Sequence, residues 1–235
     1  MNLATLRRLN EARARRAASI LITDTVSGVE RLILEEDGYA GDPLRDELAG
    51  RFRSGVSGTV TTPDGTFFLT VNVPPPKLVV IGAVHISQAL AQMAKIAGFD
   101  MTIIDPRTAF ATPERFPEVP VIAEWPDVAI AKVGLDAFTA LAVLTHDPKI
   151  DDGALIAALK AGCFYIGALG SRKTHARRLD RLRQAGAEEA ALTRIHAPIG
   201  IAIGAQSPAE IAVAVLAEIV AALRSRGLDA RQAAA

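Results

Sequence analysis

Continuous apolar runs that alternate with helix-period segments fill the chain after Pro76. An apolar run without polar alternation is typical of a strand buried on both faces, and such strands separated by helices indicate a parallel sheet covered by helices. The spacing of the runs suits right-handed crossovers. The predicted strands are 77–82, 101–104, 119–123, 140–144 and 164–169, and the predicted helices are 86–97, 128–133, 154–161 and 174–184.

A last helix is marked at both ends. Ser207 and Glu210 have the spacing of a capping box, with Pro208 at the first helical position, and Gly227 is the expected stop. We therefore predict a parallel-sheet domain over residues 77–227, followed by a flexible tail over 228–235.

The first 73 residues have a different pattern. A polar helix is predicted over 3–17, followed by β-like runs over 19–23 and 29–34. Asp42 before Pro43 predicts a helix start with Asp42 as the N-cap, and the sequence 63–65 (Pro-Asp-Gly) predicts a hairpin turn. We interpret residues 1–73 as a small α+β domain that ends at the three prolines 74–76.

Composition excludes several function classes. Among 235 residues, Lys plus Arg and Asp plus Glu both number 26, so no global field favours nucleic acid or an anionic membrane. No run approaches the ~20 apolar residues that span a bilayer, so no membrane insertion is expected. The single cysteine, Cys163, excludes an intrachain disulfide and fits a cytoplasmic protein. We interpret Cys163 as a small buried apolar side chain, with a reactive thiol as the alternative.

The first candidate site is the turn Gly82-Ala83-Val84-His85 after the first predicted strand. Asp105 follows Gly82 by 23 positions, which matches the ribose-binding carboxylate of a Rossmann-like fold. Val84 occupies the place of the second glycine in a dinucleotide fingerprint, and its side chain is expected to project toward the phosphates. The turn is thus expected to bind an anion at the following helix, or else merely to connect strand and helix.

The second and third candidates follow later strands. His146 and Asp147 come after the fourth strand and are expected to face the same crevice as His85, where they could orient a phosphate, a metal or a proton transfer; alternatively, Asp147 merely caps the loop. The segment 167–174 combines backbone N–H groups, hydroxyls and cations into a predicted phosphate cradle at Gly170, Ser171 and Arg172.

Two other features carry weaker expectations. The arginines that follow the cradle are interpreted as a solvated helix face, with an acidic partner as the alternative; they are Arg177, Arg178, Arg181 and Arg183. His196 lies in a Pro/Gly-rich loop that sequence alone leaves open as a lid or a plain crossover.

Six motifs in order resemble the XdhC/CoxF family, the maturation factors of xanthine dehydrogenase, carbon monoxide dehydrogenase and related molybdenum hydroxylases. They lie at 82–85, at 104–107, at 110–117, at 144–149 with 151–152, at 165–172, and at 195–200 with 203–205.

The resemblance implies a chaperone-like accessory factor rather than a catalyst. Such a factor binds molybdenum cofactor (molybdopterin) as cargo, protects it while its sulfido ligand is installed, and transfers it to the apo-subunit of a hydroxylase. The other expected partners are a cysteine desulfurase and a second copy of the chain, as a homodimer. The residues expected to bind the cofactor are Gly82, Ala83, His85, Asp105, Arg107, His146, Asp147, Gly170, Ser171 and Arg172; no metal ligand or catalytic residue is assigned.

Two departures from the family pattern leave alternatives open. Relatives commonly carry a Ser-Gly-Gly-Cys segment in a longer N-terminal domain, whereas this chain has only 57–59 (Ser-Gly-Thr) there, and Val84 replaces the usual glycine. The reduced N-terminal domain suggests a cofactor-free scaffold relative, which would bind a hydroxylase subunit without pterin. The Rossmann-like turn and Asp105 suggest an NAD(P)-dependent oxidoreductase, which would bind NADH or NADPH, and Val84 argues against this alternative.

Overall fold

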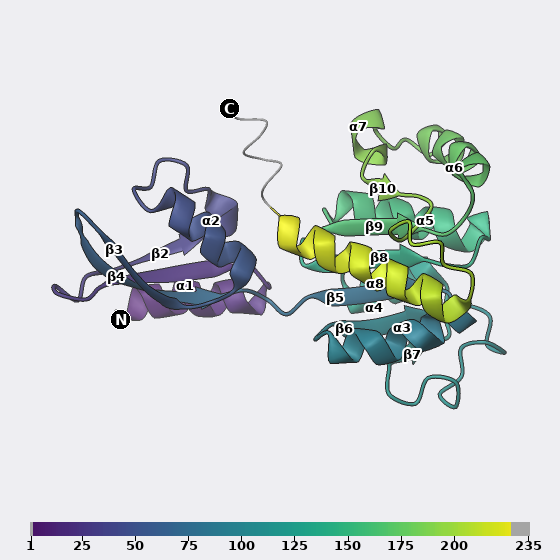
Figure 1. Cartoon of the computed structure of the whole chain (residues 1–235), viewed down its shortest axis with the longest axis horizontal. Coiled ribbons are helices and arrows are strands. Elements are labelled where there is room, and N and C mark those ends of the chain that lie inside the picture. The colour runs from purple at the N-terminus through teal and green to yellow at the C-terminus, as the bar shows by residue number, and fades with distance from the viewer. Residues whose placement is uncertain (1, 227–235) are drawn as a thin grey trace. The chain divides into compact units, whose positions relative to one another are not determined.

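The computed structural model describes residues 2–226 and divides into two compact units. The first unit holds residues 2–74 and 224–226, and the second is Pro75–Leu223 (Figure 1). Each unit has its own sheet.

The first unit is a small α+β fold built on a four-stranded antiparallel sheet with strand order β2-β1-β4-β3. Ile20 and Ile22 of the central strand β1 are buried, as are Leu48 and Phe52 of helix α2. The elements are α1 (Leu3–Ala14), β1 (Ser19–Asp24), β2 (Glu30–Leu34), the 3-10 helix η1 (Glu35–Asp37), α2 (Arg45–Ser54), β3 (Gly58–Thr62) and β4 (Gly65–Asn72).

The predicted helix start at Asp42 is wrong. Helix α2 begins at Arg45, with Leu44 in the N-cap position. Asp42 instead organises the preceding turn, because its Oδ1 accepts a hydrogen bond from the Leu44 N–H at 2.9 Å and its carboxylate pairs with the Arg31 guanidinium. An Asp-Pro pair therefore started a turn here rather than a helix.

The second unit is a Rossmann-like α/β fold, as predicted. Its six-stranded sheet is parallel, with strand order β10-β9-β8-β5-β6-β7. The chain passes from β5 to β6 and β7 on one side and then returns to β8 on the other, so the order reverses between β5 and β8. The strands are β5 (Lys77–Ile81), β6 (Asp100–Ile104), β7 (Val121–Ile122), β8 (Thr139–Val143), β9 (Tyr165–Ala168) and β10 (Ile195–His196).

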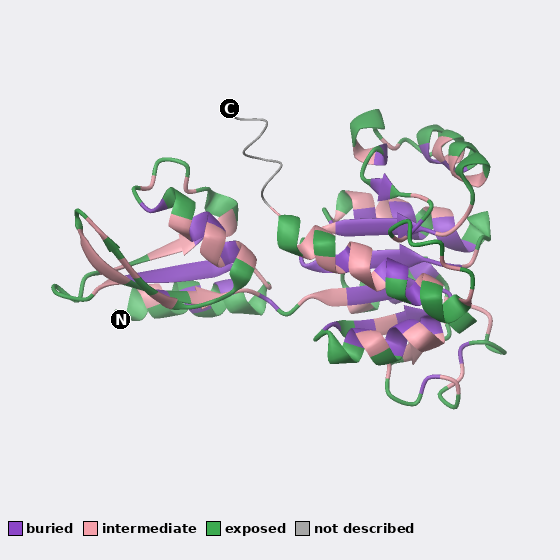
Figure 2. Cartoon of the chain, viewed as in Figure 1, coloured by how far each residue is buried: buried purple, intermediate pink, exposed green. Residues whose placement is uncertain are grey.

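Helices cover both faces of this sheet (Figure 1). Alternate strand residues enter two separate cores: Val80 and Ile103 pack with α3 and α8, whereas Ile81 and Val143 pack with α4, α5 and α6. The strands between the helix layers are accordingly buried (Figure 2). The helices are α3 (His85–Ile96), α4 (Pro126–Val133), α5 (Pro148–Lys160), α6 (Arg172–Gln184), α7 (Glu189–Leu192) and α8 (Pro208–Ser225).

Within residues 2–226, every helix is too short or too polar to cross a membrane.

The element boundaries differ from the prediction in three places. Helix α5 begins at Pro148 rather than at residue 154, because Asp147 caps its first turn and proline fits the first helical position. The strand predicted over 119–123 is only β7, and the short elements α7 and β10 were not predicted. The expected helix stop at Gly227 and the tail 228–235 lie outside the described residues.

Gly167 in β9 permits a close contact on the α8 face of the sheet. A Cβ atom there would lie 2.5 Å from the Tyr165 hydroxyl oxygen and 2.6 Å from Cγ1 of Ile199. Both neighbours are themselves buried in the core, so neither can move cheaply.

We predict that Gly167→Ala lowers the free energy of unfolding of the second unit by about 1–3 kcal/mol, because it overpacks this contact. The matched control is Gly153→Ala in α5, where an added Cβ meets no atom within 4 Å, and which should raise stability by about 0.5–1 kcal/mol. Urea unfolding followed by fluorescence of Trp125, the only tryptophan, reports on this unit. Equal effects of the two variants would contradict the prediction.

Candidate functional site at the carboxyl edge of the sheet

The predicted site residues lie in loops that leave one edge of the sheet. Because all six strands are parallel, the segments after β5, β6, β8 and β9 all begin at the carboxyl edge. In open α/β sheets, ligands bind beyond this edge where the strand order reverses, which here is between β5 and β8.

The turn after β5 touches the turn after β8. Gly82 has a φ of 117°, and a Cβ atom there would lie 2.9 Å from Cγ2 of Thr145. The Ser87 hydroxyl donates to the Gly82 carbonyl oxygen at 2.5 Å, which fixes the turn to the first turn of α3. Gly82 is therefore needed for backbone conformation and for the close approach of two loops.

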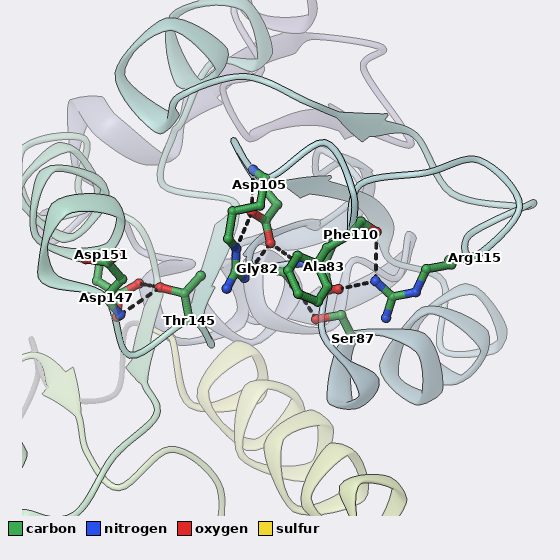
Figure 3. Close-up of polar contacts among 10 residues, drawn as sticks. Gly82, Ala83, Ser87, Asp105, Phe110, Arg115, Thr145, Asp147 and Asp151 are labelled. Carbon is green, nitrogen blue, oxygen red and sulfur yellow. Dashed lines mark hydrogen bonds and ion pairs between the residues drawn. The ribbon is translucent and has the colours of Figure 1, made fainter.

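Asp105 holds this turn from beneath. Its side chain is fully buried and accepts from the Ala83 N–H at 2.8 Å and from Nη2 and Nε of Arg107 at 2.7 and 2.9 Å (Figure 3). Burial alone would raise the pKa of this carboxyl, but the hydrogen bonds from Arg107 and Ala83 outweigh it and the pKa is lowered. Asp105 is thus an ionised residue that positions the turn, with both oxygens already hydrogen-bonded.

The N-terminus of α3 is left open beside this turn. Val84 occupies the N-cap position and provides no side-chain hydrogen bond, so the first N–H groups of α3 have no side-chain cap. Val84 is half-buried and packs against the core, so its side chain does not lie wholly on the crevice side as expected. His85, the first residue of α3, is exposed. Such a helix start favours an anion.

The loop after β6 folds back over the same turn. Arg115 donates from Nη1 to the carbonyl oxygens of Ala83 and Phe110, both at 2.8 Å (Figure 3). The Phe110 ring lies 4.7 Å from the Arg107 guanidinium carbon and 5.7 Å from that of Arg115. Arg115 and Phe110 belong to one of the quoted motifs but were not predicted as site residues; no local signal showed that Arg115 reaches Ala83, 32 residues earlier.

The turn after β8 presents His146 and uses Asp147 as a cap. His146 has a φ of 66°, an unusual conformation for a non-glycine residue, and its side chain is exposed. Oδ1 of Asp147 accepts from the Lys149 N–H at 2.9 Å, and the Asp147 N–H donates to the Thr145 hydroxyl at 3.1 Å. Asp147 therefore has the capping role that was the alternative interpretation of this motif.

A buried carboxylate lies beneath that turn. The Thr145 hydroxyl donates to Oδ1 of Asp151, which is 1% exposed (Figure 3). Burial raises the pKa of Asp151 to about 6, against the lowering effects of Thr145 and the Arg178 charge. This carboxyl titrates nearer neutrality than an ordinary aspartate.

The turn after β9 carries the predicted cradle. Ser171 caps α6, its hydroxyl accepting from the Thr174 N–H at 3.2 Å. Arg172 and Lys173 follow and are exposed, and the first turn of α6 contains no acidic residue. Cations at a helix N-terminus oppose the helix dipole, so this arrangement costs stability unless an anion offsets it.

The interpretation of the α6 arginines as a solvated face is wrong for Arg178. Arg178 is 1% exposed, and its Nη2 donates to the Leu169 carbonyl oxygen at 2.9 Å. Arg181 pairs with Asp152, and Arg183 pairs with Glu189 and Asp180. Only Arg177 lies fully on the exposed side without a described ion pair among residues 2–226.

His196 belongs to a second polar cluster, on the α8 side of the sheet. Its Nδ1 lies 3.1 Å from Oε1 of Glu218, whose Oε2 accepts from the Tyr165 hydroxyl at 2.6 Å and from the Gly200 N–H at 2.7 Å. Glu218 thereby fastens the loop after β10 to α8 and β9. The sequence showed Glu218 only as an interruption in an apolar helix.

The sequence of the second unit matches a known protein family. A family model described as the XdhC Rossmann domain matches residues 78–219, which is more than half of the chain and contains every loop of the site. The chain belongs to the XdhC family.

Curated relatives of this XdhC chain come from two bacteria. The chain is 34% identical over 205 residues to uncharacterized protein YqeB of Escherichia coli K12, covering 85% of the chain and 38% of YqeB. It is 34% identical over 146 residues to the molybdenum cofactor insertion chaperone PaoD of the same strain, covering 62% of the chain and 40% of PaoD. A probable xanthine dehydrogenase subunit of Bacillus subtilis is 30% identical over 201 residues, covering 80% of the chain and 56% of that protein.

A solved structure shares the fold. A crystal structure titled as a xanthine dehydrogenase from Bacillus halodurans aligns with a TM-score of 0.63 at 22% identity, covering 95% of this chain and 65% of that one. The XdhC chain spans about half the length of the curated relatives it matches.

Cys163 precedes β9 and belongs to none of the loops of the XdhC site. Cys163 is fully buried in the α5 side of the core, and burial raises the pKa of its thiol to about 12. Within residues 2–226, no group of three His, Cys, Asp or Glu side chains is placed to hold a metal ion.

We predict that Asp105→Asn lowers the free energy of unfolding by about 2 kcal/mol at pH 7, because it weakens the charged hydrogen bonds to the half-exposed Arg107 guanidinium. The pKa of Asp105 is lowered on folding, so its stabilisation is present above the unfolded pKa of about 3.9 and is lost as the pH falls through the folded value. The difference between wild type and variant in urea unfolding should therefore shrink below pH 4. A difference that stays constant with pH would contradict this assignment.

We also predict that the Cys163 thiol is inert in the folded XdhC chain, because it is buried and protonated. A disulfide-exchange reagent at pH 8 should label no thiol in the native chain and one thiol per chain in denaturant. Rapid labelling of the native chain would restore the reactive-thiol interpretation.

Proposed function

We propose that this chain binds molybdenum cofactor as cargo at the carboxyl edge of its parallel sheet and delivers it to a molybdenum hydroxylase. Membership of the XdhC family supports the proposal, as does the printed role of PaoD as a molybdenum cofactor insertion chaperone. In this role the chain is an accessory factor, and its residues bind and orient the cargo rather than transform it.

The observation that carries the proposal is the presence of two anion-accepting turns on either side of β8. The first is the uncapped start of α3 at Val84 and His85, and the second is the cationic start of α6 at Ser171 and Arg172. Their strands, β5 and β9, are separated by β8 alone at the carboxyl edge, and the two helices leave that edge toward opposite faces of the sheet. Molybdenum cofactor is anionic at both ends, through its phosphate and its molybdenum group, so one molecule suits two such turns.

The predicted residues divide into two roles under this proposal. Asp105 and Asp147 position the turns, since their oxygens already accept backbone N–H groups. His85, His146 and Arg172 are exposed and contact the cargo, while the half-exposed Arg107 adds a positive charge.

The alternative of an NAD(P)-dependent oxidoreductase loses its main support. A ribose-binding carboxylate must accept hydrogen bonds from sugar hydroxyls. Both oxygens of Asp105 accept from Ala83 and Arg107 and are fully buried.

We extend the proposal to the partners. The receiver of the cargo is the apo-subunit of a molybdenum hydroxylase, a cysteine desulfurase supplies sulfur while the cargo is bound, and the chain acts in the cytoplasm as a homodimer. Relatives named for xanthine dehydrogenase and for cofactor insertion support the first of these.

The proposal predicts retention of about one pterin per chain. Purified chain is incubated with molybdenum cofactor, separated by gel filtration and oxidised, and the fluorescent pterin is measured. Arg172→Ala should lower the retained pterin about tenfold, because a charge-assisted hydrogen bond is lost. The matched control is Arg183→Ala at the other end of the same helix, which should retain pterin as wild type does.

Delivery is tested with the loaded chain and a cofactor-free hydroxylase. The hydroxylase should gain activity faster from loaded chain than from free cofactor at the same concentration. Absence of pterin in the gel-filtered chain, or equal loss in the Arg172 and Arg183 variants, would contradict the proposal.

A further inference from the structure

Two buried carboxylates lie beneath the carboxyl edge, and each has one arginine partner. The Asp105–Arg107 pair is closed, with hydrogen bonds of 2.7 and 2.9 Å. The Asp151–Arg178 pair is open, since the nearest nitrogen and oxygen atoms are 3.9 Å apart. Both members of the open pair are 1% exposed.

The open pair leaves hydrogen-bond donors unused. Of the Arg178 nitrogens, only Nη2 has an acceptor, the Leu169 carbonyl oxygen, whereas Nε and Nη1 are buried without a partner. Nδ1 of His175, one turn earlier on α6, is also buried without a partner, and burial together with the Arg178 charge lowers the pKa of His175. Buried donors without acceptors cost free energy, so this cluster is suited to an additional acceptor.

Gly170 lies directly beside the buried guanidinium of Arg178. A Cβ atom at Gly170 would lie 3.8 Å from Nη2 of Arg178 and 3.2 Å from Cγ2 of Thr174. Since glycine has no side chain, no Cβ atom lies between the turn that carries Ser171 and Arg172 and the nearest guanidinium nitrogen, Nη2, which also bonds Leu169.

We propose that Arg178 is an anion-binding residue whose buried guanidinium, beside Gly170, contacts a phosphate-ester oxygen held at the start of α6. The ligand class is a phosphomonoester, and its identity as the phosphate of molybdenum cofactor rests on the proposed function. The bound oxygen supplies the acceptor that the guanidinium lacks. Arg178 then adds a buried positive charge to the exposed cations of the first turn of α6.

Asp151 makes this site dependent on pH. An ionised carboxylate 3.9 Å from Arg178 competes with an incoming anion, and burial raises the pKa of Asp151 to about 6. Anion binding is therefore accompanied by proton uptake on Asp151 and is tighter below pH 6. The other charged groups that act on Asp151 or on its partner are Asp147 and Asp152 of α5, Arg181 and His175 of α6, and Arg107 of the loop after β6.

The test uses inorganic sulfate, which keeps its charge between pH 5 and pH 7.5, with binding to the full chain measured by calorimetry. Wild type should bind sulfate about tenfold more tightly at pH 5 than at pH 7.5. Asp151→Asn should bind at pH 7.5 as tightly as wild type does at pH 5, and its remaining pH dependence should be small. Arg178→Lys, which keeps the charge but loses the planar fork, should bind about tenfold more weakly than the matched control Arg183→Lys.

Asp151→Asn and Arg178→Lys probe the site independently, so either variant is sufficient if the other fails to fold. Wild-type sulfate affinity that is unchanged by Asp151→Asn at pH 7.5, or equal affinities in the two lysine variants, would overturn it. Pterin retention by wild type together with either result would remove the Arg178 site and leave the proposed function standing. A sulfate response as predicted without pterin retention would keep the anion site and remove the cofactor as its ligand.

Discussion

The carboxylate of Asp105 is the interaction on which the carboxyl edge of the sheet depends. It accepts from the Ala83 N–H and from the main chain and side chain of Arg107, which offsets the cost of burying a charge that would otherwise be several kcal/mol. The Ala83 carbonyl oxygen is bonded by Arg115. Both polar groups of Ala83 are therefore used, and the turn after β5 has one defined shape. The first N–H groups of α3, by contrast, have no side-chain cap. They lie at the end of β5, next to the point between β5 and β8 where the strand order reverses.

The loops of the edge are joined to one another by side chains rather than by strands. Thr145 touches the turn at Gly82 through its methyl group and bonds Asp151 through its hydroxyl. Arg178 lies next to Asp151 and holds the end of β9 at Leu169. The turns after β5, β8 and β9 thus share one continuous set of contacts. The closed Asp105–Arg107 pair holds the turn after β5. The open Asp151–Arg178 pair, beneath the turns after β8 and β9, leaves donors of Arg178 without acceptors.

The sequence predicted the elements of the sheet domain well, because strands buried on both faces have a distinctive apolar pattern and β5, β8 and β9 follow it closely. It also placed His146, Ser171 and Arg172 at one edge, since parallel topology alone dictates that. It could not predict Arg178, because an arginine among the five of α6 has no local mark of burial; its environment is set by Asp151, 27 residues earlier. The role of Glu218 was not predicted for the same reason. Its partners Tyr165, His196 and Gly200 come from β9, β10 and the following loop.

The side chain of Val84 limits which ligands the turn after β5 can bind. Valine is a poor N-cap, and replacing a good capping residue typically costs about 1 kcal/mol. Here the side chain gains partial burial against the core, while the N–H groups of α3 lack a side-chain cap. A dinucleotide needs glycine at this position so that its pyrophosphate can approach the backbone closely. With valine there and Asp105 occupied, the turn offers a helix N-terminus to a single anionic group without the close backbone approach or the free carboxylate that a dinucleotide requires. This combination disfavours a dinucleotide at the turn after β5.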